Sequence, residues 1–173
     1  MDTTLIISAG ILLGCLISLS WFAGSDAPYV PTKMDQIRKI LKLAGVKKGK
    51  KFYELGSGDG RVVFEAAKLG AESFGIEQSW LRVSYSRYKA LKLTSQASQT
   101  TSGRVKFYHG NIFSKTYKDA DVIYIYLLHK GVKRLEERLK TETKKGTVVI
   151  TQTYHFSTWK PFKKVDNFWL YRE

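Results

Sequence analysis

The chain begins with an uninterrupted apolar stretch, and hydrophobic and polar positions alternate in the segments that follow it. Residues 5–23 carry no charge. As a helix rising about 1.5 Å per residue they would span roughly 28 Å, close to the roughly 30 Å of a bilayer's hydrocarbon core. A cleaved signal peptide needs basic residues before the run, and none of residues 1–4 is basic. We therefore expect residues 1–24 to form one N-terminal transmembrane helix, with a signal peptide or an interfacial helix as alternatives.

Basic residues near this stretch predict its orientation. None precedes the run, whereas four lie within about 20 residues after it, namely Lys33, Arg38, Lys39 and Lys42. Because basic flanks stay on the cytoplasmic side, the asymmetry predicts a single-pass membrane protein whose C-terminal domain faces the cytoplasm. The single cysteine, Cys15, lies inside the run and has no disulfide partner.

A linker at residues 25–32, with Pro28 and Pro31, separates this stretch from a folded domain at residues 33–173. We expect Thr32 to cap a first helix whose apolar positions recur every three or four residues up to Ala44. Strand-like and helical runs then alternate, which predicts an α/β fold with a mostly parallel twisted sheet and helices on both faces. The expected strands are 51–55, 72–77, 104–109, 122–128 and 147–153, the expected helices 60–69, 79–93 and 132–140, and the closing hairpin 163–165 with 168–171.

A glycine-rich loop stands between the first expected strand and the next helix. Residues 54–60 read Glu-Leu-Gly-Ser-Gly-Asp-Gly, with the glycines two positions apart. This spacing differs from the G-x-G-x-x-G of dinucleotide sites. The two acids would repel a pyrophosphate but suit a ligand with an ammonium and a sulfonium, so the loop predicts binding of S-adenosyl-L-methionine. The loop residues that we expect at this cofactor are Glu54, Gly56, Ser57, Gly58, Asp59 and Gly60.

Two further strand ends complete the expected cofactor site. Glu77 ends the second strand, where an acid can bind ribose hydroxyls, and Gln78 follows it. After the third strand, Asn111 can reach an adenine amino group and Ile112 can pack on the adenine face. Because ligands bind at the carboxyl ends of parallel strands, these three segments should meet around one ligand.

These motifs resemble a family of small class I protein-lysine N-methyltransferases. The family comprises archaeal broad-specificity enzymes and membrane-anchored mitochondrial enzymes that act on inner-membrane proteins such as those of the ATP synthase. The resemblance covers about residues 28–156 and is carried by Pro-Tyr-Val-Pro-Thr at 28–32, Leu-Gly-Ser-Gly-Asp-Gly-Arg at 55–61 and Asn-Ile-Phe at 111–113. It implies a Rossmann-like class I methyltransferase domain and a protein substrate at or near the membrane. The chain departs from the family at Glu54, where many members have Asp, and at Gln-Ser-Trp (78–80), where Asn-Pro is more usual.

A lysine acceptor must lose a proton before it can be methylated. With a reference pKa of about 10.4, about one lysine in two thousand is neutral at pH 7. Aromatic walls and hydroxyl acceptors can desolvate the amine, so the candidate catalytic residues are Tyr29, Thr32 and Tyr126. Tyr124 shares a strand face with Tyr126, and we expect at least one of them to pack in the core. The histidines show no metal-ligand spacing, so no metal is expected.

Charge indicates an acidic partner. Residues 33–173 hold all 29 basic side chains and 13 of the 15 acidic ones. Anionic lipid headgroups, nucleic acid phosphates or an acidic protein could balance this excess, and headgroups need the fewest further assumptions beside an anchor. The alternative is a charged face that only keeps the domain soluble. Nucleic acid is possible but not favoured.

Several acceptor chemistries remain open beside lysine. Methylation of pyrimidine C5 needs a cysteine nucleophile, which the position of Cys15 makes improbable. Residues 121–128 lack the Asn-Pro-Pro-aromatic element of adenine and glutamine methyltransferases. The alternatives are a phospholipid or small-molecule N-methyltransferase, an RNA methyltransferase, and a non-catalytic cofactor-binding membrane scaffold.

Overall fold

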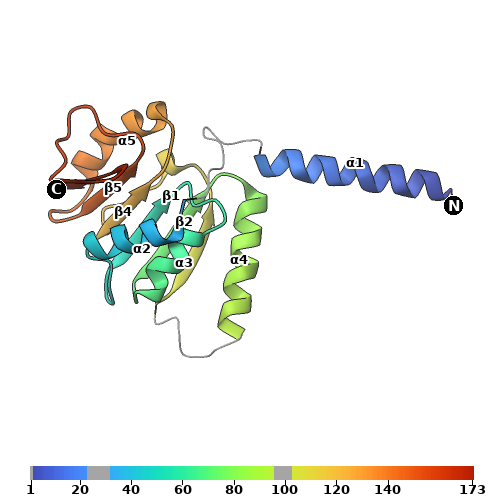
Figure 1. Cartoon of the computed structure of the whole chain (residues 1–173), viewed down its shortest axis with the longest axis horizontal. Coiled ribbons are helices and arrows are strands. Elements are labelled where there is room, and N and C mark those ends of the chain that lie inside the picture. Colours follow the sequence, from blue (N-terminus) through green and yellow to red (C-terminus); the bar gives the residue numbers. More distant parts are fainter. Residues whose placement is uncertain (1, 23–31, 96–102) are drawn as a thin grey trace.

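The computed structural model describes residues 2–22, 32–95 and 103–173, and it has a mixed sheet at its centre (Figure 1). The strands are, in chain order, β1 (Lys51–Leu55), β2 (Glu72–Glu77), β3 (Val105–His109), β4 (Val122–Ile125), β5 (Val148–Gln152), β6 (Lys163–Val165) and β7 (Phe168–Arg172). They form one seven-stranded sheet in the order β3-β2-β1-β4-β5-β7-β6. Strands β1 to β5 run parallel, and β7 is antiparallel to β5 and β6. The expected α/β fold with a mostly parallel sheet is confirmed.

Helices cover both faces of the sheet. They are α1 (Thr3–Phe22), α2 (Met34–Leu43), α3 (Arg61–Lys68), α4 (Trp80–Ser95) and α5 (His129–Glu142), with a 3-10 turn η1 (Ile112–Ser114). Of these, α1 does not cover the sheet, whereas helices α2 and α3 share a buried cluster with Phe52 of β1 and Tyr124 of β4. Helix α5 packs against Leu55 and Ile123 on the opposite face, and α4 joins α3 beside Phe107 of β3. Because side chains alternate along a strand, Glu54 lies on the α2 and α3 face of the sheet.

The order of the strands predicts a ligand crevice next to β1. From β1 the chain runs outward to β2 and β3, and from β4 it runs the other way to β5. A parallel sheet opens a ligand crevice at the carboxyl ends of the strands where its order reverses in this way. Glu54 near the end of β1 and Glu77 at the end of β2 both lie at this edge.

Several element boundaries differ from the expected ones, and two of these differences concern candidate site residues. The N-cap residue of α2 is Lys33, not Thr32, and no side chain caps this helix. Strand β4 ends at Ile125 instead of residue 128, because Ile125 pairs with Leu55, the last residue of β1, and Gly56 then turns away with φ 84°. Tyr126 therefore stands in the connection to α5, just past the sheet.

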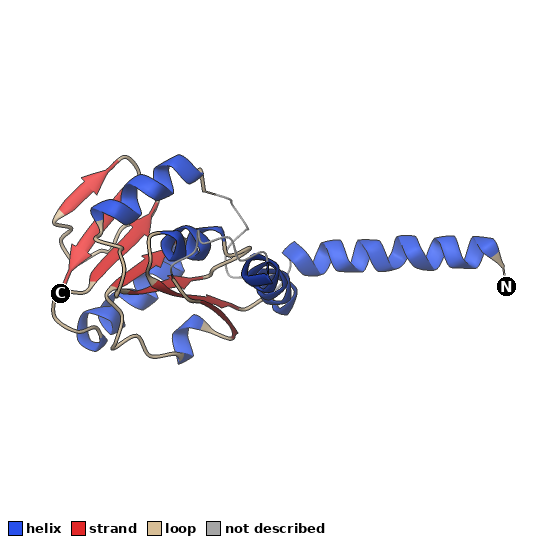
Figure 2. Cartoon of the chain, turned by 90° about the horizontal axis from the view of Figure 1, so that it is seen from below, coloured by secondary structure: helices blue, strands red, loops and turns tan. Residues whose placement is uncertain are grey.

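The N-terminal helix α1 extends away from the sheet in both views (Figures 1 and 2). Its apolar side chains are exposed, with Leu5 at 68% and Leu19 at 65%. Among the residues that the structure describes, no helix combines the length and the apolar character that crossing a bilayer requires. The prediction of a transmembrane helix at residues 1–24 is therefore corrected for the residues of this range that the structure describes.

The two edges of the sheet are short or blocked. At one edge, the Arg87 guanidinium of α4 donates to the Phe107 carbonyl of β3 from Nε and Nη2, at 3.0 and 2.9 Å. At the other, β6 has three residues, of which Lys163 and Lys164 are exposed. Strand β7 reaches β6 through the expected hairpin, whose turn residue Asp166 has φ 52°.

Candidate functional site

The glycine loop turns sharply between β1 and α3. Gly56, Gly58 and Gly60 have φ angles of 84°, 53° and 75°, all in the left-handed region. At Gly60 the backbone also passes close to the Phe107 ring, which a Cβ atom would meet at 2.5 Å. Glycine is therefore required at position 60 by both conformation and space. The turn places the backbone of the loop at the carboxyl end of β1, where the order of the strands reverses.

Glu77 ties this loop to the end of β2. Its Oε2 accepts a hydrogen bond from the Gly58 amide at 2.9 Å, and its Oε1 accepts one from the Ser79 amide at 2.9 Å. The guanidinium of Arg82, itself buried, lies 3.6 Å from the same carboxylate. The predicted ribose-binding acid thus also fixes the shape of the loop.

Glu54 and Ser57 provide buried polar atoms without protein partners. Within the described residues, Oε2 of Glu54 and Oγ of Ser57 are buried and have no hydrogen-bond partner. Burial, then the Asp59 and Glu77 carboxylates, raise the pKa of Glu54 well above its usual value. An unpaired buried carboxyl is costly, so this position suits a cationic ligand group. Asp59 differs, because its carboxylate is held by the neighbouring Arg61 guanidinium at 2.8 Å.

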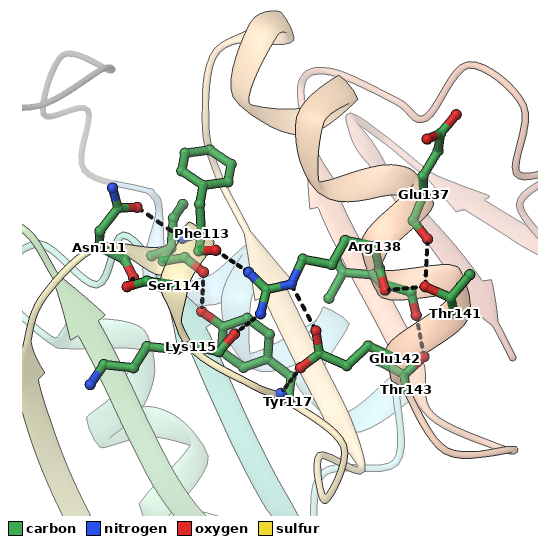
Figure 3. Close-up of polar contacts among 12 residues, drawn as sticks. Asn111, Phe113, Ser114, Lys115, Tyr117, Glu137, Arg138, Thr141, Glu142 and Thr143 are labelled. Atoms are coloured by element: carbon green, nitrogen blue, oxygen red, sulfur yellow. Dashed lines mark hydrogen bonds and ion pairs between the residues drawn. The ribbon is translucent and has the colours of Figure 1, made fainter.

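The third part of the predicted site is the turn after β3. Asn111 Oδ1 accepts a hydrogen bond from the Phe113 amide at 2.9 Å, and the amide nitrogen of Asn111 points away from the turn (Figure 3). Ile112 is partly buried against the α5-side cluster. Gln78 is exposed, and its backbone carbonyl oxygen lies 2.9 Å from His109 Nε2. The structure thus brings the ends of β2 and β3 together through Gln78 and His109.

A clamp from α5 holds this turn in shape. The Arg138 guanidinium donates to the carbonyl oxygens of Phe113 and Lys115, and its Nε bonds to Glu142 at 2.7 Å (Figure 3). Glu142 accepts from the Tyr117 amide, and the Tyr117 hydroxyl donates to the Ile112 carbonyl at 2.7 Å. Sequence reasoning missed this clamp, since nothing local connects residues 138 and 142 with residues 112–117.

A second polar cluster lies on the α2 face at the same edge of the sheet. Thr32 Oγ1 donates to Gln152 Oε1 at 3.0 Å, the Tyr124 hydroxyl donates to the same oxygen, and the two hydroxyl oxygens are 3.4 Å apart. Tyr126 is half-buried and packs against the adjoining core cluster. Tyr29 lies outside the described residues. At least one of Tyr124 and Tyr126 was expected in the core, and Tyr124 is buried there. Gln152 was missed, although a buried glutamine ending a central strand is the signal that points to it.

Metal chemistry finds no support in the described part of the chain. There, no group of three or more His, Cys, Asp or Glu side chains is placed to hold an ion.

Comparison with known proteins finds a family and several relatives. Residues 54–163 match the family model described as ANTKMT methyltransferase domain. The chain is 30% identical over 135 residues to a protein-lysine N-methyltransferase of Saccharolobus islandicus, covering 78% of this chain and 81% of the relative. It is 30% identical over 148 residues to the ATP synthase C-subunit lysine N-methyltransferase of Rattus norvegicus, covering 83% of this chain and 65% of the relative. It spans 57 to 65% of the length of the three mammalian enzymes of this name.

Solved structures share the fold. The structure called an RNA methyltransferase from Salinibacter ruber, in complex with S-adenosyl-L-homocysteine, is 32% identical. It superposes with a TM-score of 0.72, covering 83% of this chain and 92% of that one. A methyltransferase from Thiobacillus denitrificans, 19% identical with a TM-score of 0.60 over 78% of this chain and 54% of that one, shares the fold alone.

Proposed function

This chain belongs to the ANTKMT methyltransferase domain family, and we propose that it is an S-adenosyl-L-methionine-dependent protein-lysine N-methyltransferase. The observation that carries the proposal is the buried carboxyl of Glu54 beside the glycine loop, whose Oε2 has no hydrogen-bond partner among the described residues. A cofactor with an ammonium group supplies the positive charge that this carboxyl lacks. Relatives named for lysine methylation indicate the acceptor.

Different residues at the sheet edge would bind different parts of the cofactor. Glu54 and the loop amides would bind the methionine end, Glu77 the ribose hydroxyls, and Asn111 with Ile112 the adenine. The cofactor supplies a methyl group on a positively charged sulfur. The protein's task is to align the acceptor with that methyl group and to exclude water, because in-line displacement depends mainly on positioning.

We propose Tyr29, Thr32 and Tyr126 as the residues around the acceptor. Thr32 supports this role, because its hydroxyl lies in the buried cluster with Tyr124 and Gln152. Tyr126 stands past the end of β4, half-buried at the edge of the crevice. An amine among these groups is desolvated, which lowers its pKa toward the neutral form that can attack.

The substrate is the second part of the proposal. The rat relative is named for the C subunit of ATP synthase, and that name supports a protein substrate at or near a membrane. Contact with anionic headgroups stays a prediction from the basic charge of residues 33–173. Because the Salinibacter ruber structure is called an RNA methyltransferase, RNA is the competing acceptor.

A labelling experiment separates these acceptors. The full chain is incubated with S-adenosyl-L-methionine carrying a labelled methyl group and with a membrane fraction and total RNA. We expect label in protein, recovered as methyl-lysine after hydrolysis, and we expect Glu77→Ala to abolish it. Label in RNA or in lipid would contradict the lysine proposal, and calorimetric binding without transfer to any fraction would indicate a non-catalytic scaffold.

Cofactor binding is expected to strengthen as the pH rises through the pKa of Glu54. Burial and the Asp59 and Glu77 carboxylates raise that pKa, while the Arg61 guanidinium and the Val63 amide act against them. The empty protein therefore keeps a proton on Glu54 that an ammonium ligand displaces. Because the folded pKa exceeds the unfolded one, this carboxyl also lowers stability as the pH rises between the two values. Calorimetry in buffers of different ionisation enthalpy measures the released proton.

The control for this prediction is Glu54→Gln. The variant has no proton to release, so its cofactor affinity should be weaker and should not follow pH through the same range. Its free energy of unfolding should exceed that of the wild type at the upper end of the range, because the charged carboxyl is absent. The same pH dependence in both proteins would contradict the role of Glu54.

Loss of the clamp should weaken the adenine end of the site. Arg138→Ala removes the donors to the Phe113 and Lys115 carbonyls, so the turn loses its fixed shape. We expect the dissociation constant of S-adenosyl-L-methionine to rise about tenfold, or about 1.4 kcal/mol. Thr141→Ala, on an exposed hydroxyl of the same helix, is the matched control and should leave the constant unchanged. Equal affinities of Arg138→Ala and the wild type would show that the clamp is not needed for binding.

A further inference from the structure

A buried polar cluster consists of two hydroxyl groups that share one acceptor. The hydroxyls belong to Thr32 and Tyr124, and the acceptor is the side-chain oxygen of Gln152. Tyr124 of β4 is adjacent to Glu54 of β1 in the sheet register, and Gln152 ends the next strand, β5. Thr32 reaches the cluster from the segment before α2. The exposures of Thr32, Tyr124 and Gln152 are 8%, 1% and 4%. The cluster therefore sits beside the proposed position of the cofactor's charged end, in a place from which water is largely excluded.

The hydrogen bonds fix the direction of both hydroxyl protons. A glutamine side-chain oxygen can only accept, so Thr32 Oγ1 and the Tyr124 hydroxyl both donate to Gln152 Oε1. Burial raises the pKa of Tyr124, so this phenol keeps its proton to donate. Each hydroxyl oxygen then retains lone pairs that can accept a further hydrogen bond.

We propose that Thr32 and Tyr124 receive the two N–H groups of the neutral acceptor amine, with Gln152 as the positioning residue that orients their hydroxyls. This inference rests on the proposed function and names the residues that hold its acceptor. A neutral primary amine has two N–H donors and one lone pair. With both donors bound to the two hydroxyl oxygens, the lone pair is left for the methyl group.

The reaction at this position balances without a protein base. The lysine ammonium first releases a proton to water, which burial of the amine favours. The nitrogen lone pair then forms a bond to the methyl carbon, and the bond from carbon to sulfur breaks with its electron pair going to sulfur. The product is a methylated ammonium with two N–H groups, and it loses one of these protons to water after it leaves the cluster.

A set of substitutions tests the role of the hydroxyls. Thr32→Val, Tyr124→Phe and Gln152→Leu each remove one hydrogen-bonding group and keep most of the volume. We expect the rate of methyl-lysine formation in a membrane protein fraction, at saturating S-adenosyl-L-methionine, to fall at least tenfold in each. The dissociation constant of S-adenosyl-L-methionine, measured by calorimetry, should change less than twofold. The rate should also reach its plateau at a higher pH, because the amine is less well held in its neutral form.

Two controls separate this role from a structural one. Thr32→Ser keeps the hydroxyl and should therefore restore most of the rate that Thr32→Val loses. Thr151→Val removes a buried hydroxyl from the opposite face of β5, and its rate and pH profile should not change. Wild-type rates and pH profiles in the three test variants would overturn this inference and leave the proposed function in place. Equal losses of cofactor affinity and rate would also overturn it. Absence of methyl-lysine with the wild-type protein would overturn the proposed function together with the inference.

Discussion

Replacement of Glu77 by alanine is expected to raise the dissociation constant of S-adenosyl-L-methionine at least a hundredfold, or about 2.7 kcal/mol. The variant loses the proposed partner of the ribose hydroxyls. It also loses the acceptor of the Gly58 and Ser79 amides, so the glycine loop is no longer tied to β2. The carboxylate beside the buried Arg82 guanidinium disappears as well. Calorimetry with the full chain gives the constant directly.

The matched control for this prediction stands on the same strand. Glu72 begins β2, at the end of the strand away from the crevice, and its nearest ion-pair contact is Lys106 at 3.9 Å. Glu72→Ala should bind the cofactor as the wild type does. Because removing one partner of a buried ion pair costs about 3–5 kcal/mol, we also expect Glu77→Ala to be less stable, which urea unfolding measures. Cofactor affinity in Glu77→Ala within a few fold of the wild type would refute the site assignment.

Replacement of Gly60 by alanine should destabilise the domain by about 3 kcal/mol. Forcing a residue with a Cβ atom into the left-handed region costs about 1–2 kcal/mol, and Gly60 has φ 75°. The new methyl group would meet the Phe107 ring at 2.5 Å, and relieving such an overlap in a packed core costs about 1–3 kcal/mol. The free energy of unfolding in urea measures the sum.

Gly49→Ala isolates the conformational part of this effect. Gly49 has φ 83°, and a Cβ atom there meets nothing within 4 Å. We expect a loss of about 1 kcal/mol, from backbone strain without overlap. Similar losses at positions 49 and 60 would show that Phe107 moves aside freely and that the overlap contributes little.

The sequence predicts the centre of the sheet well because strands β4 and β5 are buried on both faces. Runs such as residues 122–125, all buried, stand out as apolar and β-branched between polar turns. The boundaries are less well predicted where a neighbour decides them. Strand β4 ends at Ile125 because β1 offers no further partner. Helix α5 begins at His129, three residues before the predicted start. Its N-cap residue makes no side-chain hydrogen bond, so the sequence carries no capping signal for this start.

The cofactor half of the site is predictable because it is local. The loop, Glu77 and Asn111 each lie at the end of a strand or within two residues of it, and parallel strands bring their ends together. The acceptor half depends on contacts between distant residues. The bond from Thr32 to Gln152 joins positions 120 residues apart. The repeat of apolar positions along a helix or a strand carries no information about such a contact. The sequence instead predicted that Thr32 caps the helix that follows it, because a threonine hydroxyl can bond to nearby backbone.

The protected edges of the sheet have a consequence for how the protein behaves at high concentration. An open edge strand is a template on which a second chain can add a strand and start aggregation. Here Arg87 occupies a carbonyl oxygen of β3, and β6 offers three residues of which two are exposed lysines. A strand approaching either side meets a guanidinium or a pair of ammonium groups. The sheet therefore resists growth into larger, misassembled sheets from both sides.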